Sequence, residues 1–252
     1  MPDEATPRYR RVILKISGES FAKPGDFGID PEELSLMAQE IADAAKLGTQ
    51  IAVVVGGGNM IRGSMLTEHG QIDQSTADYM GMLATVINSV ALREALTGAG
   101  QSCRLMSAID IPAVGETFIR ARALRHFEKG RTLILAAGTG NPFFTTDTCA
   151  ALRGAELNAD VLLKATKVDG VYTSDPKKDP HATRYAKLSF TEAIEKQLGV
   201  MDLTALTMCM EHNLPVIVFD FKTAGNVRRA MAGEHIGTLI AGKRDLGVAS
   251  QG

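Results

Sequence analysis

Short β-branched runs alternate along this chain with longer segments in which hydrophobic residues recur every three or four positions. The runs predict buried strands at residues 12–16, 51–55, 104–106, 133–136, 161–163 and 215–219, with a last, short one at 238–240. The periodic segments between them predict helices. Repeated strand–helix–strand order is typical of an α/β protein with a mainly parallel sheet and helices on both faces.

The first predicted helix has clear ends. Asp30 suits the N-cap, Pro31 suits the first helical position, and Gly48 suits the position just after the helix. Further helices are predicted near residues 76–97, 148–157 and 226–231. On one face, the long helix 76–97 carries Tyr79, Leu83, Val86, Ile87 and Val90.

Glycines follow three of the predicted strands. Gly18 comes after the first, residues 56–58 after the second, and Gly138 and Gly140 after the fourth. Ligands on such sheets bind beyond the carboxyl ends of the strands, so these turns are candidate binding elements. No internal repeat or clear linker is present, and a looser stretch at 174–183 marks a change from one lobe to the next.

Composition narrows the class of partner. The net charge is −2, and a protein that grips a nucleic acid polymer usually has a basic excess. No apolar run approaches the ~20 residues of a membrane helix, and the first eleven residues are polar. The three cysteines are unclustered, so neither a disulfide framework nor a zinc site is expected. We therefore expect a cytoplasmic protein that binds neither membrane nor nucleic acid polymer.

The first chemical motif is Lys15-Ile16-Ser17-Gly18. A lysine at the end of a buried strand is costly unless it meets an anion, and the following glycine lets backbone N–H groups approach that anion. The alternative is a surface lysine before an ordinary turn.

The second motif is the sequence Gly-Gly-Gly-Asn-Met-Ile-Arg-Gly at residues 56–63. The glycines expose backbone amides, and Arg62 offers a bidentate contact to phosphate oxygens, although a flexible loop is the simpler interpretation. Ile61 breaks the dinucleotide-binding pattern G-x-G-x-x-G, which counts against a dehydrogenase. A near match to a P-loop at residues 237–243 fails because Arg244 replaces Ser or Thr.

Two further motifs follow the fourth and fifth strands. Residues 138–147 join a Gly-Thr-Gly turn to Asn-Pro, two aromatic residues and Thr-Thr-Asp at a predicted helix start. Capping explains the threonines, but the two aromatic rings also suit a wall against a planar base. In residues 161–176, Tyr172 could flank an adenine and Asp175 could accept from its amino group or a ribose hydroxyl. This segment could otherwise be a hairpin.

Together these four motifs resemble the bacterial uridylate kinases of the amino acid kinase superfamily, and the match runs from about Tyr9 to Ile240. The resemblance implies a three-layer α/β/α sandwich formed by residues 1–252 as a single domain. Its amino-terminal half would bind UMP, and a lobe at about 160–252 would bind ATP. The implied activity is transfer of phosphate from ATP to UMP in pyrimidine nucleotide biosynthesis.

The resemblance also implies residue roles. The residues that would border the ATP phosphates are Lys15, Ile16, Ser17, Gly18, Gly58 and Arg62, and those at the adenosine end are Thr166, Tyr172 and Asp175. The residues that would line UMP are Gly57, Asp78, Thr139, Gly140, Asn141, Pro142, Phe143, Phe144, Thr145 and Thr146. The expected catalytic group is Lys15, Arg62, Asp147 and Asp202, with both aspartates orienting cations. Mg²⁺ would arrive on ATP, because the sequence has no dedicated carboxylate cage.

Relatives of this type are homo-oligomers, in particular homohexamers, with GTP and UTP as effectors. Arg93 lies on the long helix, Arg104 opens the next predicted strand, and Arg131 precedes the strand after that. All three are poorly placed for a site at the strands' carboxyl ends, so they are candidate effector residues that could bind a triphosphate. Solvated surface arginines are the other interpretation. The stretch containing Lys23-Pro24 departs from the glycine-rich sequence that the family links to regulation.

Two other functions stay open from the sequence. One is a non-catalytic nucleotide-binding storage or sensor protein of the same fold. Loss of charge at Lys15, Arg62 or Asp147 would favour it, and the sequence retains all three charges. The other is a kinase for a small carboxylate or carbamate. Residues 141–146 argue against that second possibility.

Overall fold

The computed structural model describes residues 8–61, 72–176, 178–243 and 246. Within them, nine strands form one sheet in the order β4-β3-β5-β2-β1-β6-β8-β9-β7. The strands are β1 (Arg11–Ile16), β2 (Gln50–Val55), β3 (Cys103–Ser107), β4 (Glu116–Thr117), β5 (Thr132–Ala136), β6 (Val161–Thr166), β7 (Lys187–Ser189), β8 (Val216–Asp220) and β9 (Thr238–Ala241). Neighbouring strands are parallel except β8 and β9, which confirms the mainly parallel sheet.

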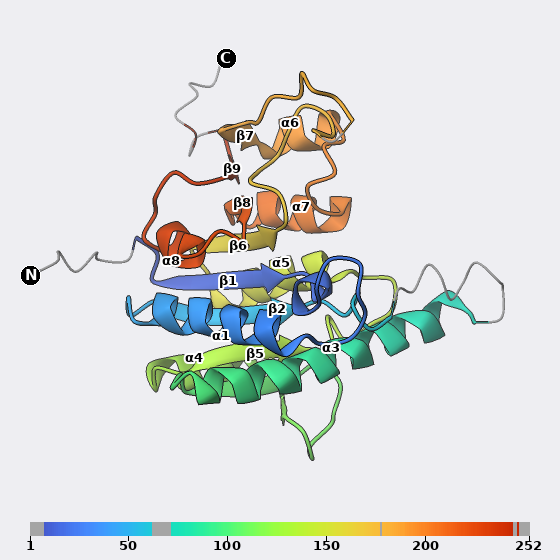
Figure 1. Ribbon diagram of the computed structural model, residues 1–252, viewed down its shortest axis with the longest axis vertical. Helices are drawn as coiled ribbons and strands as arrows, with labels where there is room; N and C mark the ends of the chain where they lie inside the picture. The colour runs from blue at the N-terminus through green and yellow to red at the C-terminus, as the bar shows by residue number, and fades with distance from the viewer. Residues whose placement is uncertain (1–7, 62–71, 177, 244–245, 247–252) are drawn as a thin grey trace, which may run out of the picture.

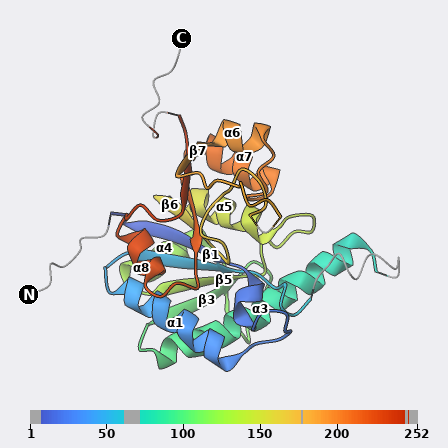
Figure 2. The same cartoon turned by 45° about the horizontal axis from the view of Figure 1, so that its top comes forward.

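Helices cover both faces of this sheet (Figures 1 and 2). They are a 3-10 turn η1 (Gly18–Phe21), α1 (Pro31–Ala45), α3 (Gln74–Gly98), α4 (Arg120–Glu128), α5 (Thr146–Leu157), α6 (Phe190–Glu195), α7 (Leu203–Glu211) and α8 (Asn226–Met231). Helices α1, α3 and α8 share one hydrophobic cluster, and α4, α5, α6 and α7 share a second. The predicted three-layer α/β/α sandwich is therefore confirmed.

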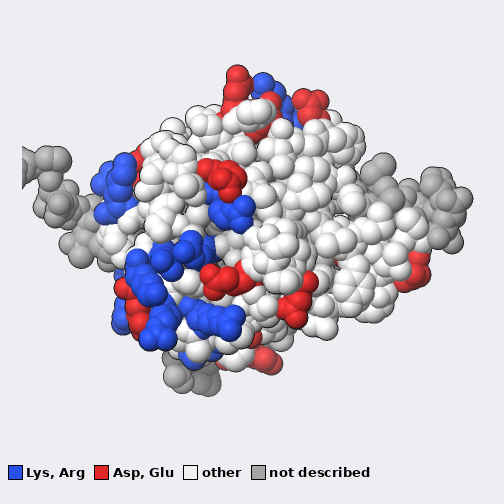
Figure 3. All heavy atoms as spheres, turned by 90° about the horizontal axis from the view of Figure 1, so that it is seen from below, with Lys and Arg blue, Asp and Glu red and all other residues white. Residues whose placement is uncertain are grey.

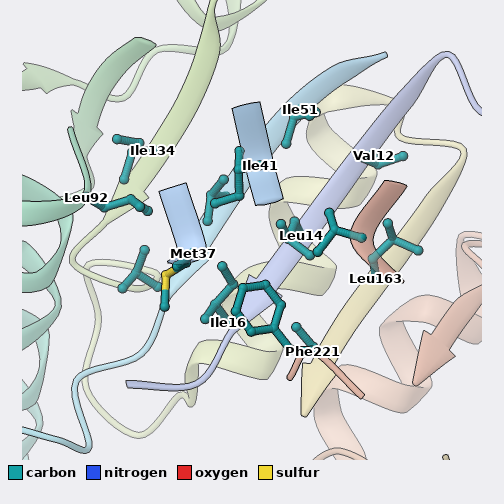
Figure 4. Packing of buried hydrophobic residues seen from close by; sticks show 14 of the residues in the cluster. Val12, Leu14, Ile16, Met37, Ile41, Ile51, Leu92, Ile134, Leu163 and Phe221 are labelled. Carbon is teal, nitrogen blue, oxygen red and sulfur yellow. The ribbon is translucent and has the colours of Figure 1, made fainter. Parts of the chain in front are cut away.

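Strand β1 shows how one short run serves both layers. Side chains alternate between the two faces of a strand. Leu14 and Ile16 belong to the cluster under α1 and α3, whereas Ile13 belongs to the cluster under α5. Figure 4 shows Met37 and Ile41 of α1 beside Leu14 and Ile16. A strand that is buried on both faces needs a continuous apolar run, which is the pattern that its sequence carries.

Helix α1 begins as predicted. The Asp30 side chain accepts hydrogen bonds from the backbone N–H groups of Glu32 and Glu33, and Pro31 is the first helical residue. The helix ends at Ala45, and Gly48 then takes a positive φ of 81°. Local capping chemistry was therefore sufficient to place this element.

Helix α3 divides its large apolar side chains between the core and the surface. Tyr79, Leu83 and Ile87 are 44%, 49% and 53% exposed. Its buried residues combine small or polar side chains with large apolar ones, namely Ala77, Met82, Ala84, Thr85, Val86, Asn88, Ser89, Leu92 and Leu96. The helix runs close to the turn after β2, where a Cβ at Gly57 would lie only 2.9 Å from the Cβ of Ala84. Of the five residues noted on one face of this helix, Tyr79, Leu83 and Ile87 thus face outward, whereas Val86 is buried and Val90 packs against the core cluster.

Several short elements escaped the sequence prediction, namely β4, β7, α4, α6 and α7. Helix α4 illustrates the reason, because only Ala123 and Phe127 of its nine residues are buried. Two apolar contacts in a segment rich in arginine give too weak a periodic signal. The three cysteines are free and buried, and no described helix is long and apolar enough to cross a membrane.

Candidate active site

The turns after β1, β2, β5 and β6 lie together, because these strands are adjacent and parallel. Two of the turns touch through their backbones. A Cβ atom at Gly18 would lie 2.5 Å from the Gly58 nitrogen, and one at Gly56 would lie 2.6 Å from the Gly18 nitrogen. Glycine is therefore required at both positions. The glycine turns after β1 and β2 therefore meet at the carboxyl edge of the sheet.

Two lysines stand side by side at this edge. Lys15 on β1 and Lys164 on β6 are direct partners in the parallel register, so their side chains leave the sheet on the same face. Ile13, two residues before Lys15, packs in the cluster under α5. Both ammonium groups accordingly reach toward the amino-terminal end of α5.

Asp147, in the first turn of α5, bridges the two lysines. Its Oδ1 lies 2.9 Å from Lys15 Nζ, and its Oδ2 lies 2.7 Å from Lys164 Nζ. The three side chains are only 10–13% exposed. Lys164 also donates to the backbone carbonyl of Val200. We call Lys15, Asp147 and Lys164 the Lys–Asp–Lys cluster; with all three groups charged, it carries one net positive charge.

Burial and charge act on the pKa values of this cluster in opposite directions. Burial raises the pKa of Asp147, but the ammonium groups of Lys15 and Lys164 lower it by more, so the pKa lies below its ordinary value. Burial lowers the pKa of Lys164, Asp147 offsets part of that effect, and Lys15 lowers it further. Two ammonium groups thus hold the carboxylate ionised in a site with little water.

The other residues predicted to border the ATP phosphates lie beside the cluster where the structure describes them. Ile16 ends β1, and Ser17 stands directly before the turn η1 that contains Gly18. Gly58 touches Gly18, as described above. Arg62, the second predicted cation, lies outside the described residues.

A cavity of about 170 Å³, the amino-terminal cavity, lies where the turn after β2, helix α3 and loop 137–146 meet. All ten residues predicted to bind UMP belong to these segments, and seven of them line the cavity. Those in the lining are Gly57, Asp78, Thr139, Asn141, Phe144, Thr145 and Thr146, together with Gly58. Gly140, Pro142 and Phe143 lie in the same loop but outside the lining.

Asp78, in the second turn of α3, already holds this loop. Its Oδ2 accepts the backbone N–H of Phe143 at 2.7 Å, and its Oδ1 accepts from Gln74 at 2.8 Å. Phe143 has a positive φ of 70° and is 74% exposed, so its ring is outside the cavity. Of the two predicted aromatic walls, Phe144 alone lines the cavity.

Thr85 of α3 supports the start of the same loop. Ala137 and Gly138 leave β5 with positive φ angles of 62° and 55°. A non-glycine residue in this conformation costs on the order of 1 kcal/mol and needs support from its surroundings. The Thr85 hydroxyl accepts the Ala137 N–H at 2.8 Å and donates to the carbonyl of Met82 at 2.7 Å. Helix α3 therefore positions both the glycine turn and the loop after β5.

Asp202 stands at the start of α7, at the N-cap position. Its carboxylate caps α7 by accepting the Ala205 N–H at 2.9 Å. It also accepts from the hydroxyl groups of Thr145 and Thr148, the latter at 3.0 Å. Its hydrogen bonds therefore go to the start of α5 rather than to Lys15, and they link α7 to the loop of the amino-terminal cavity.

A larger cavity of about 580 Å³, the carboxy-terminal cavity, opens beside β6 and contains the predicted adenosine residues Thr166, Tyr172 and Asp175. The Tyr172 hydroxyl donates to Asp169 at 2.7 Å. Lys164 belongs to the lining as well. Asp147 directly follows Thr145 and Thr146, which line the amino-terminal cavity, and it binds Lys164, which lines the carboxy-terminal cavity. The Lys–Asp–Lys cluster therefore connects the linings of the two cavities.

A third hollow of about 450 Å³ lies at the opposite, amino-terminal edge of the strands. Arg93, Arg104 and Arg122 are among its lining residues, and we call it the arginine hollow. Arg93 donates to the carbonyl of Val114 at 2.8 Å. Figure 3 shows Lys and Arg side chains gathered on one part of the lower face, whereas much of the rest of that face carries no charged side chain.

Arg131, the third predicted effector residue, is outside the lining of this hollow but is connected to it. It lies 3.1 Å from Nδ1 of His126, and Nε2 of that ring lies 3.1 Å from Glu116. Glu116 in turn lies 3.5 Å from Arg104. Since arginine is only a donor, His126 accepts at Nδ1 and its other nitrogen donates to Glu116. The structure thus brings Arg93 and Arg104 together and connects Arg131 to Arg104 through His126 and Glu116.

The prediction from sequence gave no role to Lys164, although it quoted the segment that contains it. A signal was present, because Lys164 interrupts an otherwise apolar strand run. A charge in such a run points to a buried partner. Among the residues that the structure describes, no group of three or more His, Cys, Asp or Glu side chains could hold a metal ion.

Comparison with known proteins identifies a family whose model matches most of this chain. Residues 10–220 match the model of the amino acid kinase family. A UMP kinase from Bacillus anthracis is 41% identical, with a TM-score of 0.90 over 92% of this chain and 96% of that one. A UMP kinase from Ureaplasma parvum is 35% identical, with a TM-score of 0.87 over 93% and 99%. A uridylate kinase from Archaeoglobus fulgidus is 29% identical, with a TM-score of 0.71 over 91% and 99%.

Proposed function

The chain belongs to the amino acid kinase family, and we propose that it is a nucleoside monophosphate kinase that transfers the γ-phosphate of ATP to UMP. The products are ADP and UDP, so the reaction supplies pyrimidine nucleotide synthesis. The observation that carries this proposal is the buried Lys–Asp–Lys cluster between two cavities of unequal size. Two nucleotides bound on either side of such a cluster would direct their phosphates at it.

The amino-terminal cavity is the proposed acceptor site. Thr139 and Asn141 offer polar groups, Phe144 offers an aromatic face for the base, and Asp78 is placed to accept from a ribose hydroxyl. Asp78 now accepts from the backbone of Phe143. Binding of the ribose would therefore share or replace that hydrogen bond, which makes the loop sensitive to the acceptor.

The carboxy-terminal cavity is the proposed ATP site, which fits a division into an amino-terminal UMP half and an ATP lobe at about 160–252. Tyr172 and Asp175 stand at its outer end for the adenosine, and Lys164 stands where the phosphates would approach the cluster. Gly18 and Gly58, which meet at the neighbouring turns, would border the same phosphates.

Transfer proceeds by attack of a phosphate oxygen of UMP on the γ-phosphorus. A new P–O bond forms as the bond from the γ-phosphorus to the oxygen bridging it to ADP breaks, and its electron pair leaves with ADP. A phosphate oxygen is already ionised at neutral pH, so no general base is needed. The chain supplies alignment and charge. Lys15 and Lys164 offset negative charge on the transferring group, while Asp147 keeps both ammonium groups in place.

Mg²⁺ is proposed to arrive on the phosphates of ATP rather than in a cage made by the chain. Asp147 is engaged by two lysines, and Asp202 by threonine hydroxyls and a backbone N–H. The described carboxylates near the cluster therefore do not form a set of free oxygen ligands for the ion. Its chemistry would be to neutralise phosphate charge.

We further propose a homo-oligomer, in particular a homohexamer, that works in the cytoplasm and responds to GTP and UTP. The exposed stripe of Tyr79, Leu83 and Ile87 on α3 supports self-association, because it is a row of large apolar side chains. The arginine hollow supports an effector site, because guanidinium groups bind phosphates bidentately.

The test is an ADP-release assay with ATP, Mg²⁺ and a panel of UMP, CMP, dUMP, TMP and carbamate, with the phosphorylated product identified. UMP should be turned over far faster than the others. Equal or faster turnover of CMP or carbamate would refute the uridylate assignment. Nucleotide binding without any ADP release would instead indicate the non-catalytic storage or sensor protein.

A further inference from the structure

A pair of buried asparagines lies directly behind the glycine turn. Asn59 belongs to that turn and is 2% exposed, and Asn88 lies in the middle of α3 and is fully buried. Asn59 Nδ2 donates to Asn88 Oδ1 at 3.0 Å, and Asn88 Nδ2 donates to Asn59 Oδ1 at 2.6 Å. The two side-chain amides therefore face each other as a reciprocal pair.

Each amide also makes a second bond to a different backbone segment. Asn88 donates to the Gly56 carbonyl at 2.8 Å, and Asn59 donates to the Gly28 carbonyl at 2.7 Å. All four N–H bonds of the pair are thereby used. A buried amide that lacks partners is costly, so this network is stable only in one arrangement of the three segments.

The position of the pair matters because of what the glycine turn must do. Gly57 and Gly58 line the proposed acceptor cavity, and Gly58 touches Gly18 beside the Lys–Asp–Lys cluster. Glycines give the backbone close access to phosphate, but they also leave it loosely restrained. Preorganised donors contribute to phosphoryl transfer only when they are held in place before the reaction.

We propose that Asn88 is a positioning residue for phosphoryl transfer, which fixes the glycine turn through its bond to Gly56 and its pairing with Asn59. The inference rests on the proposed function and deepens it. Asn88 touches neither nucleotide site, since it is fully buried and absent from the linings of both cavities. Its effect therefore passes through the backbone of the turn.

The test compares Asn88→Ala with Ser89→Ala. Ser89 is the next residue of α3, is equally buried, and donates to the Thr85 carbonyl within the same helix. Each variant removes buried hydrogen bonds from α3, but only Asn88→Ala releases the glycine turn. We expect kcat to fall about tenfold to a hundredfold in Asn88→Ala, with the KM values for UMP and ATP within about twofold of wild type. Ser89→Ala should keep kcat within about twofold.

A second variant, Asn59→Ala, keeps the experiment decisive if Asn88→Ala does not fold. It removes the pair but leaves Asn88 able to donate to Gly56, so its kcat should fall less, by about threefold to tenfold. The double variant should be no slower than Asn88→Ala alone, because both residues act through one network. Thermal melting of every variant establishes that the protein assayed is folded.

The outcomes separate this inference from the proposed function. If wild type transfers phosphate and folded Asn88→Ala matches Ser89→Ala in kcat, the positioning role is wrong. The positioning role is also wrong if Asn59→Ala, assayed alone, retains wild-type kcat. If wild type prefers an acceptor other than UMP, the kcat of each variant is compared with the wild-type kcat for that acceptor. A wild-type chain that transfers no phosphate overturns the proposed function and this inference together.

Discussion

The two edges of the parallel sheet hold positive charge in opposite ways. At the carboxyl edge, Lys15 and Lys164 are buried and share one carboxylate. At the amino edge, the Arg93 and Arg104 side chains are 34% and 44% exposed, and their acidic partners are on the surface. A buried cation is weakly screened and points in one direction, whereas an exposed guanidinium is screened by solvent and adjusts to its ligand.

This difference assigns different tasks to the two edges. Fixed charge in a dry site acts on charge that develops during a reaction, which is what phosphoryl transfer requires. Adaptable surface charge suits reversible capture of a polyphosphate from solution. Substitutions at the buried edge should therefore change stability and kcat, and substitutions at the exposed edge should change regulation.

The largest expected effect is on stability and comes from Asp147→Asn. The change leaves two neighbouring buried ammonium groups without their carboxylate, and breaking a buried ion pair in this way costs about 3–5 kcal/mol. Urea unfolding measures the loss. The control is Asp43→Asn, which removes an exposed partner of Lys46 and should cost less than about 1 kcal/mol. Equal losses in the two variants would contradict the account of the buried cluster.

Lys15→Ala should lower kcat by about a hundredfold, on the order of 3 kcal/mol, because it removes a cation aimed at developing charge. Lys46→Ala, an exposed lysine on α1's carboxyl end, serves as control and should keep wild-type kcat. Turnover and thermal melting are measured together. A folded Lys15→Ala with nearly normal kcat would make Lys15 a structural residue only.

The lowered pKa of Lys164 predicts the pH dependence. As pH rises through this folded-state pKa, the ammonium group loses its proton and kcat should fall, by up to about tenfold per pH unit. The sign for stability is opposite. Between the lowered folded value and the ordinary 10.5, the unfolded chain binds more protons, so the Lys164 contribution rises with pH.

Lys164→Arg isolates this effect, because arginine stays protonated across the range. The alkaline fall in kcat should be absent from the variant or lie at higher pH. A pH profile recorded for both proteins decides the matter. An alkaline limb that does not move would show that another group titrates.

Asp78→Asn should raise the KM for UMP about tenfold and leave kcat and the KM for ATP nearly unchanged, because a ribose contact is made in ground and transition states alike. The amide can still accept the Phe143 N–H, so the loop should remain in place. Asp73→Asn, at the N-cap of the same helix, is the matched control, since asparagine caps equally well. A change in the KM for ATP alone would place Asp78 in the wrong half.

The smallest expected effect on basal rate comes from the double variant Arg93→Ala, Arg104→Ala. Its rate without effector should stay within about twofold of wild type, while the response to GTP disappears. Arg125→Ala removes an exposed arginine of α4 that does not line the hollow and should keep the response. Rates against GTP concentration and light scattering test both proteins. A monomeric wild type that is indifferent to GTP would refute the proposed assembly and control together.

The central strands could be predicted from sequence because they are short, β-branched and buried on both faces, whereas β4 and β7 are only two and three residues long. In β6 the prediction fell short because a charged residue interrupts the apolar pattern. Residues 161–163 were predicted, but β6 continues to Thr166 through Lys164, the buried lysine that binds Asp147. A charged residue within a buried parallel strand looks, in the sequence alone, like the end of that strand. In the folded protein the charge is balanced by a partner from another element, and the strand continues.

Helix α3 shows a second limit of prediction from the sequence. Its existence followed from its length and periodicity, but its orientation did not. Large side chains such as Leu83 and Ile87 suggest a core face, yet a Cβ at Gly57 would lie 2.8 Å from the Gly81 carbonyl oxygen. The approach is this close at Gly81 and Ala84, where the helix carries small residues. The requirement comes from a turn that precedes the helix in the chain, so no pattern within the helix could reveal it.

The amino-acid sequence by itself determined the α/β class, the glycine turns at the strand ends, and the candidacy of Lys15 and of residues 138–147. Each of these depends on local chemistry, namely backbone conformation, capping and the cost of a charge in an apolar run. Only the tertiary structure decided that Lys15 stands beside Lys164, that Asp147 serves both, and that Asn88 holds the turn at Gly56. These are relations between segments far apart in the chain. They are set by strand register and helix packing, which bring together groups whose spacing in the sequence carries no sign of their contact.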